Sequence, residues 1–329
     1  MIKEHIKYLV CPSCQNELDI IINGTEENRV MEGKLICDKC SQEYPVVKGI
    51  PRFVKDNNYA ANFGLEWNIH SRTQYDDSSG FKISEERFLN ETKWGKDLKG
   101  ELILEAGSGS GRFTKHAVET GAMIISLDYS NAVEANYKSN SHADNLLIIQ
   151  ASIFEMPFKK NLFDRVLCIG VIQHTPHPRQ AFHCLVDVMK KGGHICTDTY
   201  LKSFASIYLT PKYLIRKITK HMNPQKLYKL TVSYINFIWP VTRVIRKIPF
   251  GKKIIWRLMV ADYSDWMPNA DDKTLKDWAI LDSYDMVSPA YDYPQTLKTY
   301  KKWHNEEGLV DIDVHYGYNG IESRAKKPI

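Results

Sequence analysis

Residues 102–114 read Leu-Ile-Leu-Glu-Ala-Gly-Ser-Gly-Ser-Gly-Arg-Phe-Thr, and this stretch decides the fold. Its first residues predict a buried strand that ends at Glu105, after which Gly107, Gly109 and Gly111 alternate with serines. Alternating glycines let the backbone turn tightly and approach a ligand with no Cβ in the way. A helix that begins near Gly111 would direct free N–H groups and its positive dipole end at the same ligand. The stretch therefore predicts a ligand-binding turn between a strand and a helix.

The spacing of these glycines distinguishes between two kinds of nucleotide site. The dinucleotide fingerprint G-x-G-x-x-G fails, because its third glycine would fall at Arg112. The pattern present is E-x-G-x-G-x-G, which resembles motif I of class I S-adenosylmethionine (SAM)-dependent methyltransferases. The resemblance implies that Glu105 orients the amino-acid end of SAM and that the turn contacts the cofactor through Gly107, Ser108, Gly109 and Gly111. A tight strand-to-helix turn without a ligand is the alternative.

The sequence around this turn predicts an α/β fold. Apolar runs separated by helical lengths lie at 102–104, 123–127, 146–150, 165–169 and 194–199, which is typical of a parallel sheet buried on both faces. Runs at 310–316 and 321–325, joined by Gly-Tyr-Asn-Gly, predict a terminal hairpin. In the resembled family the last two strands complete a Rossmann-like sheet of seven strands with one antiparallel strand. We expect that fold here.

Residues after the later strands are further candidates for cofactor binding. Asp128 follows the second strand, where an acid can accept hydroxyl groups of a ribose, although a helix-capping role is the alternative. Tyr129 would then lie against the adenine. The family usually has Asp after the third strand, but this chain has Ser152 followed by Ile153, so Ser152 and backbone groups would hold the adenine. The resemblance also implies that two residues after the fourth strand line the methyl-transfer channel, Ile169 and Gly170.

Two histidines follow the fourth strand on a loop that resembles the family's motif IV and the segment after it. His174 and His177 are the candidate catalytic residues, because a neutral imidazole beside the sulfonium can accept a hydroxyl proton. A structural hydrogen bond at the strand end is the alternative for each. The family's N-methyltransferase signature, Asn or Asp followed by Pro-Pro-Tyr, is absent, which disfavours amino-group acceptors.

The N-terminal residues predict a metal site. Cys11 and Cys14 form one C-x-x-C pair, and Cys37 and Cys40 form another. Two such pairs complete a closed tetrahedron of four thiolates that suits structural zinc and leaves no open position for catalysis. Iron in a rubredoxin-like site is the alternative metal. Residues 35–54 resemble the zinc-ribbon family whose eukaryotic members activate tRNA and protein methyltransferases, here fused to the enzyme.

Composition and charge divide the rest of the chain. We expect a zinc ribbon at 1–55, a helical connector that covers the cofactor at 56–99, the SAM-binding core at 100–200, a basic helical insertion at 201–270, and C-terminal helices and strands at 271–329. The sequence shows no signal peptide and no membrane-spanning run. Because paired C-x-x-C motifs favour a reducing compartment, we expect a cytoplasmic protein.

The insertion has an unusual charge. Residues 202–260 contain 13 of the 44 Lys and Arg residues and no Asp or Glu, so the rest of the chain carries a net charge of −8. Pro211, Pro224, Pro240 and Pro249 predict that the segment is cut into short amphipathic helices, with Trp239 and Trp256 as interfacial anchors. The alternatives are a lid with a solvated basic face, an anionic membrane or lipid-linked substrate, and nucleic acid.

Together these features predict a zinc-ribbon-fused SAM-dependent methyltransferase. We expect an oxygen nucleophile on a small-molecule, sugar or lipid-linked acceptor, whose identity the sequence does not give. The acidic and aromatic segment at 281–292 is a candidate for the acceptor pocket. An RNA methyltransferase and a non-catalytic docking protein are the alternatives. The retained acid, glycine turn and second-strand Asp disfavour the docking protein.

Overall fold

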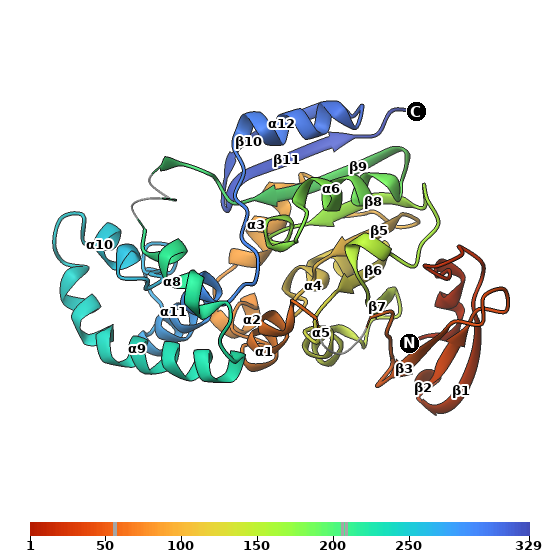
Figure 1. The fold of residues 1–329 in the computed structure, drawn as a ribbon, viewed down its shortest axis with the longest axis horizontal. Helices are drawn as coiled ribbons and strands as arrows, with labels where there is room; N and C mark the ends of the chain where they lie inside the picture. Colours follow the sequence, from red (N-terminus) through yellow and green to blue (C-terminus); the bar gives the residue numbers. More distant parts are fainter. Residues whose placement is uncertain (55–57, 205–206, 208–209) are drawn as a thin grey trace.

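The computed structural model of the chain describes residues 1–54, 58–204, 207 and 210–329. Within these residues a small four-stranded sheet precedes a seven-stranded sheet, and a helical lobe projects from the side of the larger sheet away from the small one (Figure 1). The expected α/β class and the seven-stranded sheet are confirmed.

The large sheet has the order β10-β11-β9-β8-β5-β6-β7. Its strands are β5 (Leu102–Ala106), β6 (Met123–Asp128), β7 (Leu146–Gln150), β8 (Phe163–Cys168), β9 (Met189–Thr199), β10 (Val310–Gly317) and β11 (Gly320–Lys326). Only β11 runs antiparallel to its neighbours in this sheet, as expected. The chain moves outward from β5 to β7 and then returns to β8 on the other side of β5. Ligands bind at such a reversal, outside the carboxyl ends of the strands.

Helices cover both faces of the sheet. Successive side chains of each buried strand point to opposite faces, so each face presents apolar side chains on which helices pack. Leu104 and Val166 pack in one cluster with α6 (Pro178–Asp187) and α12 (Leu297–Glu306). Ile103 and Leu167 pack in the other cluster with α3 (Ile83–Thr92), α4 (Arg112–Glu119) and α5 (Val133–Asn140). Short 3-10 turns follow β7 and β8 at η2 (Ile153–Glu155) and η3 (Ile172–His174).

The N-terminal unit consists of η1 (Lys3–Tyr8), β1 (Asp19–Glu26), β2 (Arg29–Ile36), β3 (Glu43–Val47) and β4 (Ile50–Pro51). It docks on the β7 edge of the large sheet (Figure 1). Arg52 forms a parallel bridge with Gln150 of β7, and its guanidinium donates to the Gln150 Oε1 at 2.7 Å and to Glu134 at 2.9 Å. The Val10 amide also donates to the Pro157 carbonyl. The ribbon thus covers an edge strand whose backbone groups would otherwise be unpaired.

The connector contains α1 (Ala61–Ile69), α2 (Asp76–Ser79) and α3. Ser84 lies in the first turn of α3, but its hydroxyl donates to the Gln74 carbonyl and does not cap the helix. The Asp76 carboxylate caps the helix from eight residues upstream, where it accepts the Ser84 and Glu85 amides at 2.8 Å each. A long-range cap of this kind leaves no signal at the helix start itself.

The insertion folds into α8 (Lys212–Thr219), α9 (Pro224–Ile245) and α10 (Gly251–Arg257), which pack with α11 (Asp272–Val287). The expected break at Pro240 is wrong, because α9 continues through it. Beside the proline, the buried Trp239 packs on α11 and donates its indole N–H to Asp272 at 3.0 Å, which holds the helix in place. Trp239 is therefore a core residue and is not exposed at an interface.

Acidic residues at 262–292 neutralise part of the charge of the basic segment 202–260. Asp292 pairs with Lys212 and Arg216, and three further pairs are Arg243–Asp272, Arg246–Asp262 and Lys252–Asp265. The basic residues of 202–260 are thus not uniformly solvated, although the sequence shows no acid among them. No helix in the described ranges is long and apolar enough to cross a membrane.

Candidate cofactor and acceptor site

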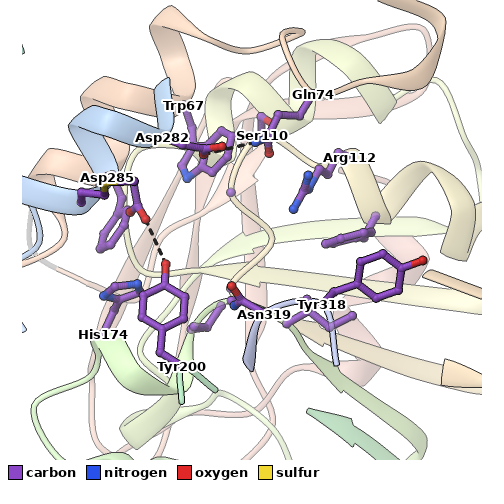
Figure 2. Close-up of a pocket in the computed structure, with 18 of the residues that line it drawn as sticks. Trp67, Gln74, Ser110, Arg112, His174, Tyr200, Asp282, Asp285, Tyr318 and Asn319 are labelled. Carbon is purple, nitrogen blue, oxygen red and sulfur yellow. Dashed lines mark hydrogen bonds between the residues drawn. The ribbon is translucent and has the colours of Figure 1, made fainter. Parts of the chain in front are cut away.

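A cavity of about 520 Å³ lies at the carboxyl ends of β5, β6 and β8, the position expected from the strand order. Its wall includes nine of the residues predicted from the sequence: Gly107, Ser108, Gly109, Asp128, Tyr129, Ile153, Ile169, Gly170 and His174. The connector adds Tyr59, Phe63 and Trp67 to the wall, and the insertion and α11 supply its far end (Figure 2).

The glycine turn is shaped by close neighbours. Gly107 has φ of +82°, and a Cβ there would lie 2.2 Å from the Val171 Cγ2. Gly109 has φ of +54°, and a Cβ would lie 3.2 Å from the Trp67 Nε1. Both positions therefore need glycine for backbone conformation and for space. Val171 and Trp67 lie against these two glycines. The Gly107 and Ser108 amides donate to the Leu127 carbonyl, which ties the turn to the neighbouring strand β6.

Asp128 ends β6 and organises the turn from the neighbouring strand. Its Oδ2 accepts the Gly109 amide at 2.9 Å, and its Oδ1 accepts the Ser130 amide at 2.8 Å and the Ser130 hydroxyl at 2.7 Å. Burial raises the pKa of Asp128, and these hydrogen bonds oppose that rise because they favour the charged carboxylate. The residue lines the cavity while it caps the local backbone, so its capping role does not remove it from the cavity wall.

Three predicted cofactor residues lie behind the wall. Glu105 is buried, and its Oε2 accepts the hydroxyls of Thr114 and Ser126, so it ties the turn to α4 and β6. Burial raises the pKa of Glu105 to about 7. Gly111 is the N-cap of α4 with φ of +87°, where a Cβ would meet Asn136. The Ser152 hydroxyl accepts the Phe154 amide and caps η2.

The loop after β8 is fixed by the end of β9. Asp198 accepts the Gly170 amide at 2.5 Å and pairs with Arg87 of α3 at 2.7 Å. This chain of contacts joins three elements behind Ile169 and Gly170, so these two residues of the cavity wall have a rigid support.

The two histidines separate in the structure. The His174 Nδ1 lies 3.0 Å from the Tyr291 carbonyl oxygen, and its ring packs between Phe63 and Tyr200. A carbonyl only accepts, so Nδ1 carries the proton and the neutral ring keeps its lone pair on Nε2. His177 lies instead at the N-cap of α6, beside Phe154, and lines a different depression.

The far end of the cavity is an acceptor chamber with carboxylates among aromatic rings. Asp285 accepts the Tyr200 hydroxyl at 3.0 Å, next to His174 in Figure 2. Asp282 receives a long contact of 3.4 Å from the Gln74 amide, and its Oδ2 is buried with no hydrogen bond to a described residue. Burial, followed by the nearby Asp285 charge, raises the pKa of Asp282 to about 7. Arg112 lines the same chamber, and burial lowers its pKa to about 10.

Some of these residues carried a usable sequence signal and others did not. Asp282 and Asp285 belong to the acidic and aromatic segment 281–292, which was a candidate for this pocket. Tyr200 follows β9 directly, and the rule that ligands bind at strand ends would have selected it. Arg112 is the residue that interrupts the dinucleotide fingerprint. Gln74 reaches the chamber from the connector with no local pattern to mark it.

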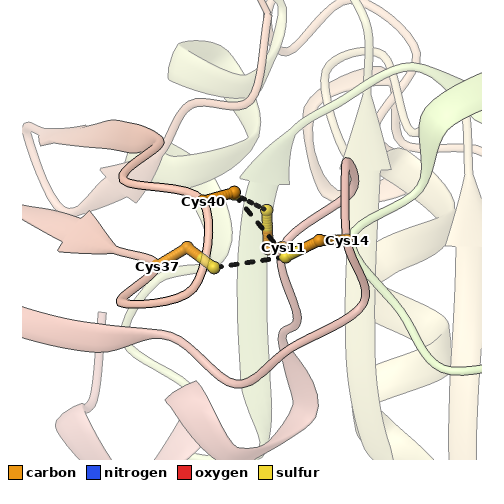
Figure 3. Close-up of side chains that lie close together, drawn as sticks. All are labelled: Cys11, Cys14, Cys37 and Cys40. Atoms are coloured by element: carbon orange, nitrogen blue, oxygen red, sulfur yellow. Dashed lines mark hydrogen bonds between the residues drawn. The ribbon is translucent and has the colours of Figure 1, made fainter.

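The four N-terminal cysteines come together as expected (Figure 3). Their sulfur atoms all lie within 4.8 Å of one another, and the Cys14 Sγ is 3.3 Å from the Cys37 Sγ. A tetrahedral zinc with Zn–S bonds of about 2.3 Å has S···S edges of about 3.8 Å, so the cluster fits the ion with small adjustments. All four thiols are free of disulfides. The donor set therefore suits structural zinc.

Comparison with known families agrees with this geometry. Residues 104–197 match the family model described as "Methyltransferase domain", and residues 3–49 match the model described as "Trm112p-like protein". The chain is a methyltransferase-domain protein with a Trm112p-like N-terminal domain. The first model spans β5 to β9 and ends before the insertion, so the acceptor chamber lies largely outside the family match.

Individual relatives match shorter parts of the chain. A ubiquinone biosynthesis O-methyltransferase of Alkalilimnicola ehrlichii is 28% identical over 131 residues, which cover 37% of this chain and 52% of that protein. A tRNA U34 carboxymethyltransferase of Ruthia magnifica is 31% identical over 112 residues, covering 32% and 35%. The chain spans about half the length of the curated relatives it matches. A solved complex of the Haloferax volcanii Trm112 methyltransferase activator with its candidate methyltransferase covers 84% of this chain and 100% of that one, at 12% identity and a TM-score of 0.46.

Proposed function

We propose that this methyltransferase-domain protein moves the methyl group of SAM to a hydroxyl oxygen of an acceptor held in the chamber. The observation that carries the proposal is that the glycine turn, Asp128, His174 and the two chamber carboxylates all face one cavity. Bound SAM supplies an electrophilic methyl group on its sulfonium. The chain's own part is to align an acceptor oxygen with that methyl group and to remove its proton.

The cofactor end of the cavity fits an adenosine group. Gly107, Ser108 and Gly109 line the cavity without bulky side chains, and Asp128 keeps acceptor capacity beyond its three internal bonds. Tyr59 and Tyr129 lie 4.9 Å apart between ring centroids and offer flat surfaces for a base. Trp67 and Phe63 add apolar surface to the cavity wall beside the turn. In this proposal Ser152 acts indirectly, through the cap it provides for η2.

His174 is the proposed general base. Its Nδ1–H is held by the Tyr291 carbonyl, which fixes the tautomer with a lone pair on Nε2. Aromatic neighbours on both sides fix the plane of the ring. His177 is not part of this proposal, because it lines another depression.

The chamber favours a hydroxylated acceptor. Asp282 and Asp285 can each accept hydrogen bonds from acceptor hydroxyls, Arg112 can donate, and aromatic rings provide apolar faces for the acceptor's body. A sugar, a phenol or the head group of a lipid-linked molecule has this combination of groups. The carboxylates would repel a phosphate placed beside the reacting oxygen.

RNA is the second candidate acceptor class. The Trm112p-like match and the relative named as a tRNA U34 carboxymethyltransferase favour it. An RNA substrate would bind through phosphate contacts, so its affinity would fall steeply with salt. Acceptors that bind through the chamber alone would show little salt dependence.

The test is methyl transfer from methyl-labelled SAM into a cell extract fractionated into RNA, protein, lipid and small molecules. We expect label in the lipid or small-molecule fraction as an alkali-stable methyl ether. Label in RNA would establish the second candidate. An absence of label in all fractions, with SAM binding intact, would refute methyl transfer.

The identified fraction then serves to test the base. His174→Gln should lower turnover by about 10²- to 10⁴-fold, with SAM affinity within about threefold of the parent. His177→Gln is the matched control, because it changes a histidine on the same loop that does not line this cavity. Equal turnover in both variants would remove His174 from the mechanism.

A further inference from the structure

Helix α9 carries a row of apolar side chains that stay exposed, one of which, Tyr234, also donates its hydroxyl to the Leu258 carbonyl. Six large apolar residues follow one another at intervals of four and three positions along α9 and the turn after it, and each is between 39 and 82% exposed: Leu230, Tyr234, Phe237, Val241, Val244 and Ile248. This spacing places them on one side of a helix, over about 27 Å at 1.5 Å per residue. We call this set the exposed α9 row.

The row is separate from the face of α9 that packs into the lobe. Leu227, Ile235 and Trp239 are buried on that second face, where Ile235 and Trp239 share a cluster with Trp278 of α11. Helix α9 is thus apolar on two sides, of which the lobe covers one. A helix with two apolar sides requires a partner on the second side as well.

Two other helices of the lobe also expose apolar side chains. Leu214 and Ile218 of α8 are separated by one helical turn and are 68 and 72% exposed. Phe250 and Ile254, at the start of α10, are 75 and 40% exposed. Single exposed apolar residues are ordinary on a soluble protein, but three adjoining helices that each expose several are not.

The charges beside this surface define what can cover it. Eight cations of the insertion make no ion pair with a described residue: Lys202, Lys217, Lys220, Lys226, Lys229, Lys247, Lys253 and Arg257. Lys229 directly precedes Leu230, so it lies about 100° around the helix from the row, on the side away from the buried Thr231. The acids at 262–292 that form ion pairs with the insertion pair with its remaining cations. The apolar row is therefore flanked by unpaired positive charge.

We propose that the exposed α9 row and its flanking cations bind an anionic lipid surface. The apolar side chains would contact the acyl region of such a surface, and the neighbouring Lys and Arg would contact its negatively charged head groups. Residues 202–260 contain no Asp or Glu that the head groups would repel. A second copy of the chain would place identical cations next to one another, and the segment 202–260 has no acid to neutralise them. A nucleic acid would neutralise the cations but would leave the apolar row exposed to water.

Two exposed residues of the same lobe line the acceptor chamber. Trp256 of α10 and Trp266 both line the cavity, and they are 39 and 53% exposed. The wall of the chamber therefore reaches the surface at α10. If the proposed function holds, which this step requires, an amphiphilic acceptor would enter the chamber from the lipid surface with its hydroxylated head group first.

The test is co-sedimentation of the intact protein with vesicles of phosphatidylcholine alone or with 30% phosphatidylglycerol. We expect binding to the anionic vesicles only, reduced by high salt. Phe237→Asp combined with Val244→Asp should lower the bound fraction at least tenfold, as should Lys226→Glu combined with Lys229→Glu. Lys252 and Arg243 are left unchanged, because their ion pairs support the fold.

The matched control is Tyr316→Asp, which changes an equally accessible aromatic residue on the edge strand β10. It should bind vesicles like the parent protein. Calorimetry with SAM on every variant reports folding, and unchanged affinity is required before sedimentation is compared. Vesicle binding without methyl transfer would overturn the proposed function and leave the lipid surface standing.

Four outcomes would overturn the lipid proposal. They are sedimentation with neither vesicle, sedimentation that the row variants do not change, a concentration-dependent dimer that Phe237→Asp dissociates without lipid, and binding of tRNA that the row variants leave intact while vesicles fail to bind.

Discussion

Replacement of Asp128 by alanine tests the cofactor end of the cavity. A carboxylate offers about four acceptor positions. Three of these accept the Gly109 amide, the Ser130 amide and the Ser130 hydroxyl. One position is left for a ribose hydroxyl, so the structure allows one strong hydrogen bond where the sequence favoured two.

One hydrogen bond to a charged group contributes about 1.5–3 kcal/mol. At about 1.4 kcal/mol for each factor of ten, Asp128→Ala should weaken SAM binding by about 10- to 150-fold. Isothermal titration calorimetry measures this directly. Ser130→Ala is the control, because it removes one internal partner and keeps the carboxylate, and it should change the affinity by less than about threefold.

Three results would refute this reasoning. A change of less than about threefold in Asp128→Ala would mean that the carboxylate does not contact the cofactor. An equal loss in Ser130→Ala would mean that only the shape of the turn matters. A loss beyond about 1,000-fold would mean that the carboxylate makes two bonds to the ribose, since two such bonds together contribute about 3–6 kcal/mol.

Three further predictions concern the metal, the domain contact and the chamber. Cys40→Ser should lower bound zinc from about one ion per chain to near zero in metal analysis and unfold the ribbon, and full zinc content would contradict the four-thiol site. Arg52→Ala should lower the free energy of unfolding in urea by about 1.5–3 kcal/mol, because its guanidinium donates to Gln150 and Glu134, and an unchanged urea midpoint would contradict that. The pKa of Asp282 is raised in the folded state to about 7, so the folded protein binds this proton more tightly than the unfolded chain, and stability should fall as pH rises from about 4 to 7. Asp282→Asn should flatten that slope in thermal melts at several pH values, and superimposable pH profiles would exclude the effect.

The parts of the molecule that the sequence predicted well depend on local patterns. The central strands, the glycine turn and the paired C-x-x-C motifs each lie within a few residues, and the sheet order follows from strand and helix alternation. Residues 146–150 were predicted as a strand with the same bounds as β7.

The parts that were missed depend on contacts between distant segments. Nothing near Pro240 indicates that α9 continues, because the support comes from Asp272 on another helix. In the sequence, the charged residues of 202–260 are all basic. In the structure, acids at 262–292 form ion pairs with several of them. His174 and His177 are three residues apart and were both candidates for the catalytic base. The backbone turns between them, so His174 lines the main cavity and His177 lines a different depression.

The docking of the ribbon on β7 has a consequence for how the two domains cooperate. Two separate polypeptides joined by the same Arg52 contacts would associate according to their concentrations. Fusion holds the ribbon at an effective concentration on the order of millimolar, so even a weak contact stays occupied. Each sheet also receives one ribbon, and no other protein can compete for it. If loss of zinc unfolds the ribbon, the Arg52 contacts with β7 would be lost within the same molecule, whatever the abundance of any partner.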